Sequence, residues 1–368
     1  MKAVSLFSGA GGLDIGFQKA GYEVIWANDF NRNACDTYDM NHSIKIKCGD
    51  IRDYYDELST IKGVEVVFGG PPCQGFSIAG KMDPNDERSK LLFSFFDVVE
   101  RVDPNVFVLE NVKALAVLEK WESTREAMIA RAHSLGFDHV ELIILNASEY
   151  GVPQKRERMF LIGVKGHSNS LPDAIESIVK GKQVVTPPIR EYFKKLGRAG
   201  SETNSGVCAA KITLAKKPVL RASPFAGMMF NGAGRPIDSD GYSNTLTASM
   251  GGSRTPIIDE EEVFDGKASW IKELHSVLRS GGTTAGFTVP TRLRRITTQE
   301  AAMIQTFPRD YIFSGPQSSV YKQIGNAVPC NLAFIVASSI MEYLQPEVKK
   351  EQLRAKTKVR KTKSVTVS

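Results

Sequence analysis

Cysteine is scarce in this chain, and no two of its cysteines have the spacing of a metal site. Five occur in 368 residues, none in a Cys-x-x-Cys pair, so the sequence indicates neither a zinc site nor a disulfide framework. Free thiols are typical of a reducing compartment, and we therefore expect a cytoplasmic protein. The five are Cys35, Cys48, Cys73, Cys208 and Cys330.

Long apolar runs and a secretory leader are also missing. No apolar stretch approaches the roughly 20 residues that a membrane-spanning helix needs. The opening, MKAVSLFSGAGG, passes from a short apolar stretch straight into glycines, unlike a signal peptide. We therefore expect no membrane association. The length of 368 residues exceeds one average domain, which leaves room for a large core and a second lobe.

The net charge of +6 hides an uneven distribution. Residues 1–180 hold 20 Lys and Arg against 26 Asp and Glu, residues 181–300 hold 17 against 11, and residues 345–368 hold 8 against 2. A basic second region suits a polyanion such as nucleic acid, although an ordinary solvated surface has the same composition. The last segment lacks apolar periodicity, which predicts a disordered basic tail.

Apolar strands alternate with amphipathic helices over the first 165 residues, which predicts an α/β fold with a mostly parallel sheet. VELIILN and RMFLIGV have only a loop between them, so we expect an antiparallel pair that closes one edge of the sheet. Residues 166–290 are rich in Gly, Ser, Thr and Pro and predict a smaller, irregular domain. Helices return near the end, where Thr297 and Glu300 have the spacing of a capping box.

Three features at successive strand ends indicate a cofactor site. LFSGAGG follows the first strand, and its glycines permit close approach of a ligand to the backbone. Its pattern is GxGG, not the GxGxxG of dinucleotide folds. Asp29 ends the second strand and Asp50 follows the third, and an acid at the end of the second strand commonly holds ribose hydroxyls. Each feature alone also suits an ordinary turn or helix cap, but together they predict a nucleoside-containing cofactor.

Reactive side chains are expected near the same edge. FGGPPCQGFS places Cys73 just after the apolar strand VEVVF, at the end where α/β sheets bind ligands. Glu110 ends the next strand, where burial would raise its pKa; a helix cap is the alternative. Arg156 and Arg158 begin an expected edge strand, two residues apart and so on one face, and a solvated pair is the alternative there.

Six segments in order resemble the motifs of the C5-cytosine DNA methyltransferases: LFSGAGG, GGPPCQGFS, ENV, QKRER, RRITTQEAAMIQTFP and QIGNAVP. The resemblance covers residues 3–165 and 291–343. It implies a Rossmann-like methyltransferase fold that uses S-adenosylmethionine and releases S-adenosylhomocysteine. It also implies a discontinuous catalytic and cofactor-binding domain over 1–165 and 291–344. Residues 166–290 correspond to the target-recognition domain, where SNTLTA is similar to the family's Thr-Leu element.

The resemblance assigns a role to each candidate site residue. The thiolate of Cys73 adds to C6 of a cytosine flipped out of the duplex, while Glu110 bonds N3 and the exocyclic amine. Arg158 meets O2, and Arg156 supports the pocket or a phosphate. The expected cofactor-binding residues are Phe7, Gly9, Gly11, Gly12, Asp29, Phe30, Asp50, Ile51, Pro71, Asn326 and Ala327. The expected DNA-binding residues are Ser77, Lys81 and Arg88 of a lid over 75–90, with Thr245 and Leu246.

The activity implied is methylation of cytosine C5 within a specific double-stranded DNA sequence, as part of a restriction-modification or related defence system. The expected partners are DNA and a cognate restriction endonuclease or other defence components. We expect a monomer without a metal, in the cytoplasm and associated with the nucleoid through DNA.

Three alternatives compete with this activity. An RNA cytosine methyltransferase of the same family usually lacks so long a recognition lobe. A non-catalytic DNA-binding relative would lack the cysteine or the glutamate. A cysteine hydrolase needs a histidine, and all five histidines lie outside the six motifs. The target sequence itself cannot be read from an irregular lobe.

Overall fold

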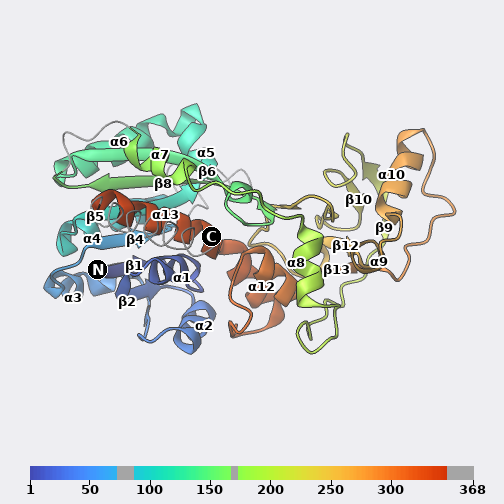
Figure 1. The fold of residues 1–368 in the computed structure, drawn as a ribbon, viewed down its shortest axis with the longest axis horizontal. Helices are drawn as coiled ribbons and strands as arrows, with labels where there is room; N and C mark the ends of the chain where they lie inside the picture. The colour runs from blue at the N-terminus through green and yellow to red at the C-terminus, as the bar shows by residue number, and fades with distance from the viewer. Residues whose placement is uncertain (73–86, 167–172, 346–368) are drawn as a thin grey trace, which may run out of the picture.

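The chain forms two lobes joined side by side (Figure 1). The computed structural model describes residues 1–72, 87–166 and 173–345, without the side chains of 87–90. The first lobe is built on a large sheet, and the second contains α8, α9, α10 and short strand pairs, with α12 between the two (Figure 1).

The first lobe contains a seven-stranded sheet of order β3-β2-β1-β4-β5-β8-β6. The strands from β3 to β5 in this order pair in parallel, whereas β8 is antiparallel to both β5 and β6. This confirms the mostly parallel α/β sheet and its antiparallel pair. Arg158 was expected on an edge strand, which is wrong, because β8 lies between β5 and β6. The strands are β1 (Lys2–Leu6), β2 (Glu23–Asp29), β3 (Lys47–Cys48), β4 (Val66–Gly69), β5 (Val106–Val112), β6 (His139–Asn146) and β8 (Glu157–Val164).

Helices cover both faces of this sheet because its strands are apolar on both sides. One face packs on α1 (Gly12–Lys19), α2 (Arg32–Asn41), α7 (Ala174–Lys180) and α13 (Cys330–Leu344). The other packs on α3 (Tyr55–Thr60), α4 (Glu87–Val102), α5 (Lys113–Val117) and α6 (Glu122–Ser134). Ile175 and Val179 of α7 lie in the first of these cores, so residues from within 166–290 pack on the sheet.

The last helix returns to the first. A Cβ atom built on Gly16 of α1 would lie 2.4 Å from both Ala333 Cβ and Phe334 N of α13. Only a glycine lets the two helices approach this closely. The C-terminal helix therefore completes the layer that the N-terminal motif begins.

The second lobe is more regular than expected, because amphipathic helices interrupt its loops. They are α8 (Ile189–Leu196), α9 (Glu260–Asp265) and α10 (Trp270–Arg279). Two antiparallel pairs accompany them, β9 (Leu214–Val219) with β10 (Met228–Phe230) and β12 (Ile257–Asp259) with β13 (Leu293–Arg295). Ile271 and Leu274 of α10 pack with Met229 and Phe230 in a small core of this lobe.

A third core joins the two lobes. It contains Ala10 after β1, Ile189 and Phe193 of α8, Leu246, and Ile324 of α12. The elements at this joint include α11 (Thr298–Ile304) and α12 (Gln317–Asn326). The capping box of Thr297 and Glu300 is confirmed at the start of α11.

One segment among the described residues, Gln317–Leu344, is long and apolar enough by composition to cross a membrane. Of its most apolar window, 67% is buried inside the protein. The segment comprises α12 and α13, and its apolar side chains pack in the cores described above.

Candidate active site

The glycine turn after β1 is held against the end of β2. Phe7, Gly9 and Gly11 all have left-handed backbone angles, with φ of 53°, 56° and 76°. The amide of Gly9 donates a hydrogen bond to Oδ2 of Asp29 over 2.8 Å. Within the described part of the chain, no atom outside the turn lies within 4 Å of the position that a Cβ of Gly9 would take. The turn therefore leaves open space beside a backbone that is tied to the predicted ribose-binding acid.

Asp29 and Phe30 lie at the carboxyl end of β2. The second oxygen of Asp29 accepts the amide of Asn31 over 2.8 Å. Burial raises the pKa of Asp29, and the amides of Asn31 and Gly9 partly offset this. Phe30 is 78% exposed. An apolar ring left in solvent beside a polar strand end suits stacking on a planar ligand.

Asp50 caps a short turn, η1 (Ile51–Tyr54). Its carboxylate accepts two hydrogen bonds from the guanidinium of Arg52, at 2.9 and 2.6 Å. Hydrogen bonding to Arg52 holds the pKa of Asp50 below its usual range. Ile51, the first residue of this turn, is buried.

The C-terminal motif contacts the glycine turn, although the two lie near opposite ends of the sequence. A Cβ on Gly12 would lie 2.6 Å from the carbonyl oxygen of Val328 and 3.1 Å from Ala327 Cβ. Asn326, at the end of α12, is exposed. The predicted cofactor residues of the two ends of the sequence are therefore in contact.

Glu110 and Arg158 form a shielded ion pair on adjacent strands. Nε of Arg158 on β8 lies 2.9 Å from Oε1 of Glu110 on β5. Glu110 is 8% exposed. Burial raises its pKa, and the positive charges of Arg158 and Arg156 partly offset this. A carboxyl whose proton is retained can donate a hydrogen bond to a ring nitrogen.

The chain that leads to Cys73 is anchored beside this pair. A Cβ on Gly70 would lie 2.8 Å from Oε2 of Glu110. Nδ2 of Asn111 donates to the carbonyl of Pro71 over 3.2 Å, and Pro71 is buried. Cys73, Ser77 and Lys81 lie outside the described residues, and Arg88 lies in α4 without a described side chain.

Arg156 differs from Arg158 in its partners. Its guanidinium donates to the carbonyls of Leu246, over 2.8 Å, and Gly325, over 3.0 Å. The residue is 1% exposed. A phosphate contact by Arg156, one of the two roles expected, is therefore wrong, because no surface of this side chain is left for DNA. Support of the pocket is the role that its contacts favour.

The Thr-Leu element lies against the first lobe. Oγ1 of Thr245 donates to the carbonyl of Lys155 over 2.8 Å, although the residue is exposed. Leu246 is 1% exposed and packs in the core between the lobes. The expected DNA contact of Leu246 is therefore wrong for its side chain, which is committed to packing. The element pairs with β7 (Gln154–Lys155) through β11 (Ser243–Asn244).

Two buried glutamines were missed by sequence reasoning. Gln154 and Gln305 are both 0% exposed and hydrogen-bonded to each other. Both stand in quoted motifs, QKRER and MIQTFP. For Gln305 the available signal was an amide between the apolar residues of MIQTFP, because a buried amide needs a partner. Gln154 is followed by charged residues, so its sequence neighbours gave no such signal.

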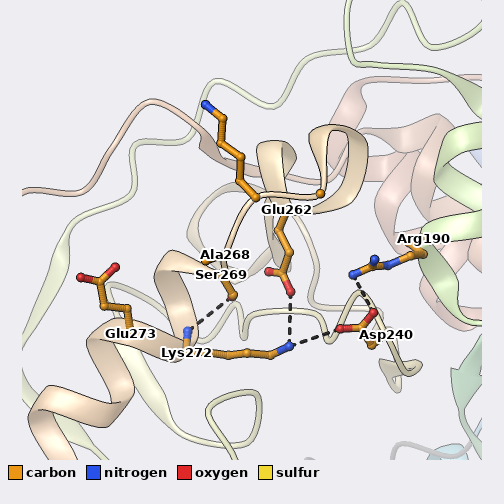
Figure 2. A pocket seen from close by; sticks show the side chains of 9 residues that line it. Arg190, Asp240, Glu262, Ala268, Ser269, Lys272 and Glu273 are labelled. Atoms are coloured by element: carbon orange, nitrogen blue, oxygen red, sulfur yellow. Dashed lines mark hydrogen bonds and ion pairs between the residues drawn. The ribbon is translucent and has the colours of Figure 1, made fainter.

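A separate hollow in the second lobe is lined by balanced charges (Figure 2). It encloses about 650 Å³. Lys272 reaches between Asp240, at 3.3 Å, and Glu262, at 3.5 Å, and Arg190 lies 2.6 Å from Asp240. These charges neutralise one another. Across residues 1–72, 87–166 and 173–345, no group of three or more His, Cys, Asp or Glu is placed to hold a metal ion.

A family model described as C-5 cytosine-specific DNA methylase matches residues 1–342. The Type II methyltransferase M.FnuDI of Fusobacterium nucleatum is 30% identical over 97% of this chain and 99% of its own length. M.NgoFVII of Neisseria gonorrhoeae, also a Type II methyltransferase, is 31% identical over 96% of this chain and 90% of its own length.

A solved structure supports the fold. It is a prophage-encoded protein of E. coli described as a DNA modification methyltransferase, with a TM-score of 0.64 and 20% identity. The match covers 94% of this chain and 99% of that one. The Rossmann-like arrangement predicted from the motifs is therefore confirmed.

Proposed function

The chain belongs to the C-5 cytosine-specific DNA methylase family and is a DNA cytosine-C5 methyltransferase, and from this premise we propose its mechanism. It acts on a specific double-stranded sequence, flips the target cytosine out of the duplex, and forms a covalent bond from Cys73 to C6. The observation that carries this proposal is the shielded pair of Glu110 and Arg158, beside the chain that leads to Cys73.

The cofactor site fits an adenosyl group. Asp29 would accept ribose hydroxyls beside the Gly9 amide that it already binds, Phe30 offers an exposed ring, and the turn at Gly9 leaves open space. Asp50 and Ile51 would line the adenine, with Pro71 below it. S-adenosylmethionine, when bound, supplies a sulfonium methyl group that C5 accepts, and S-adenosylhomocysteine leaves.

Gly11, Gly12, Asn326 and Ala327 would close this site from the turn and from the C-terminal motif. Phe7 shares the left-handed turn with the glycines. All of these contacts belong to one end of the parallel sheet, where such folds bind ligands.

Glu110 and Arg158 stabilise the charge that develops on the base. C5 of cytosine is a poor nucleophile until a thiolate adds to C6, which pushes electron density onto N3 and O2. A protonated Glu110 donates to N3, and Arg158 donates to O2. Burial raises the pKa of Glu110, which favours the proton-donating form. Arg156 fixes the strand that carries Arg158.

The bonds balance over the catalytic cycle. The Cys73 thiolate forms the bond to C6, and C5 gains the methyl group. A base outside the six motifs, which we take to be water, then removes the C5 proton. The electron pair of that C–H bond restores the C5–C6 double bond and expels the thiolate, and N3 returns its proton to the carboxylate of Glu110. The stacked duplex hides C6, so the base must be flipped at a cost of a few kcal/mol.

We further propose the division into a catalytic domain of 1–165 and 291–344 and a target-recognition domain of 166–290, whose helix α7 packs on the sheet of the first lobe. Double-stranded DNA is the partner, with a cognate restriction endonuclease or other defence components in the same cell. Ser77, Lys81, Arg88 and Thr245 are proposed to contact DNA. We propose a monomer in the cytoplasm.

The test is methyl transfer to DNA by Cys73→Ala and Glu110→Gln. Cys73→Ala should abolish transfer and leave cofactor affinity nearly unchanged, because the thiol touches the base alone. Glu110→Gln should lower the rate by about 10²- to 10⁴-fold, because the amide cannot supply the proton. Cys208→Ala is the matched control and should keep wild-type activity, because Cys208 is a free, partly buried cysteine outside the proposed site.

A duplex with 5-fluorocytosine at the target gives a second readout. Fluorine at C5 cannot leave as a proton, so the protein should remain bound to the DNA through denaturing electrophoresis. Residual activity of Cys73→Ala near wild type would refute the mechanism. Methylation of transfer RNA but not of DNA would favour the RNA-directed alternative.

A further inference from the structure

A chain of buried amides crosses the joint between the lobes. The amide of Leu246 donates to Oε1 of Gln154 over 2.8 Å, and Nε2 of Gln154 donates to Oε1 of Gln305 over 2.9 Å. Nε2 of Gln305 donates to the carbonyls of Ile324, over 2.7 Å, and Ala327, over 3.0 Å. We call Gln154 and Gln305 the amide relay.

The direction of the amide relay is determined at both ends by backbone groups. The Leu246 N–H can only donate, so it selects the oxygen of Gln154. The carbonyls of Ile324 and Ala327 can only accept, so they select the nitrogen of Gln305. Turning either amide over would set donor against donor or acceptor against acceptor. Because both glutamines are fully buried, water cannot replace the lost bonds.

Other contacts hold the same two segments in register. Arg156 donates to the carbonyls of Leu246 and Gly325. A Cβ on Gly325 would lie 2.3 Å from the carbonyl oxygen of Thr247. The segment around Leu246 and the end of α12 therefore cannot shift independently without breaking buried hydrogen bonds.

The two ends of the amide relay lie at different parts of the proposed site. One end is next to Thr245, in the element proposed to face DNA. The other is Ala327, which contacts the glycine turn of the proposed cofactor site. Resting on the proposed function, we propose that Gln154 and Gln305 are positioning residues that couple DNA binding to cofactor binding. By thermodynamic reciprocity, each ligand must then tighten the other by the same factor.

The coupling factor is the measurement that tests this proposal. It is the ratio of the dissociation constants of S-adenosylhomocysteine without and with a duplex carrying the sequence that the enzyme methylates. For the wild type we expect a factor of at least about 5, the lower end of typical allosteric coupling. Gln154→Met and Gln305→Met should each lower the factor toward 1. The double variant should lower it no further than either single one, because one chain is broken in each case.

Gln323→Met is the matched control. Gln323 lies in α12 and, like Gln154 and Gln305, is buried. Its side chain forms hydrogen bonds with Ser314, Ser319 and Thr37 rather than with the amide relay. It should lose stability as the relay variants do, but it should keep the wild-type coupling factor.

Gln154→Glu provides a test that does not require the buried site to accept a methionine side chain. Its carboxylate can still accept from Leu246 but sets an acceptor against Oε1 of Gln305. When protonated, it can donate to that oxygen and restore the chain. Burial raises the pKa of such a carboxyl. As the solution is acidified, the coupling factor of Gln154→Glu should therefore rise toward that of the wild type, with both proteins measured at each pH.

Four results would overturn the coupling in an active enzyme. They are a wild-type factor of 1, relay variants that keep the wild-type factor, an equal loss in Gln323→Met, and a Gln154→Glu variant whose factor relative to wild type does not change with pH. Absence of methyl transfer to DNA by the wild-type protein would instead overturn the proposed function, and the coupling with it.

Discussion

Arg156 and Arg158 stand two residues apart and have different partners. Arg158 faces the carboxylate of Glu110, whereas Arg156 faces two backbone carbonyls from distant segments. A guanidinium has five donors in a rigid plane and can serve either purpose. At the scale of single residues, the partner decides whether such a side chain acts on a substrate or holds the scaffold.

Asp14, in the first turn of α1, gives a prediction at the residue scale. It is fully buried, accepts the hydroxyl of Tyr38 over 2.9 Å, and its Oδ2 has no hydrogen-bond partner among the described residues. Burial raises its pKa to about 7. Near pH 5 the folded protein therefore keeps the proton of Asp14, whereas the unfolded chain has already released it. The free energy of unfolding falls as the pH rises toward 7 and this difference disappears.

Asp14→Asn should remove this dependence, because the amide resembles the neutral acid. Between pH 5 and pH 8 we expect the wild type to lose about 3 kcal/mol of unfolding free energy relative to the variant. Urea unfolding at the two pH values measures this difference. Parallel losses in both proteins would show that Asp14 is not the titrating group.

At the scale of elements, helices from the two ends of the chain form one layer behind the proposed cofactor site. Gly16 of α1 lies against Ala333 and Phe334 of α13, and Gly12 lies against Val328. The glycine turn and the start of α1 therefore pack against the C-terminal helix and the residues that precede it. Its position depends on how closely these helices pack.

Gly16→Ala tests this close approach. Alanine in a helix interior is favoured over glycine by about 1 kcal/mol. Its Cβ would lie 2.4 Å from a backbone nitrogen and from Ala333 Cβ, and overpacking of this kind costs about 1–3 kcal/mol. Because the neighbouring atoms are backbone and a short side chain, they cannot move aside, and we expect net destabilisation with weaker cofactor binding.

Gly181→Ala is the control for that substitution. Gly181 ends α7 with φ of −64°, and the nearest atom to a Cβ there lies at 3.4 Å. Its melting temperature should equal or exceed that of the wild type in a thermal scan. If Gly16→Ala melts no earlier than Gly181→Ala, the two helices are not packed as closely as the structure has them.

At the scale of the whole molecule, the lobes share a core instead of meeting through a wet surface. Side chains from the glycine turn, α8, the Thr-Leu element and α12 pack together there. A large apolar interface restrains relative domain motion. If the second lobe binds DNA as proposed, that DNA would therefore meet a proposed catalytic site that is already in position.

The segment 345–368 gives a prediction at this scale, although residues 346–368 lie outside the described residues. It holds 8 Lys and Arg against 2 Asp and Glu. Basic residues that contact phosphates release counterions, which makes affinity sensitive to salt. Truncation after Leu344 should weaken DNA binding modestly, reduce the slope of log affinity against log salt, and leave the methylated sequence unchanged.

A salt series with full-length and truncated protein measures both quantities. Identical slopes would mean that the tail makes no phosphate contacts. Bisulfite sequencing of DNA from cells that express each form checks the target, and a changed target sequence would contradict the proposed role.

The sequence by itself determined the features that depend on local patterns. Apolar alternation predicted the parallel sheet, and the strand ends placed Asp29 and Glu110 at one edge, because parallel strands share their carboxyl ends. The capping box at Thr297 followed from side-chain spacing alone. Six ordered motifs were enough to indicate the family, because their residue types and their order are properties of the chain itself.

The tertiary structure alone decided which side chains have a free surface and which backbone groups they bind. Leu246 was expected to contact DNA and is buried, and Arg156, expected to support the pocket or a phosphate, binds two backbone carbonyls. Every residue has a carbonyl, so residue types cannot encode which carbonyl a buried donor finds. That choice depends on how distant segments pack together, and it is why the amide relay between Leu246 and Ala327 was not predicted from the sequence.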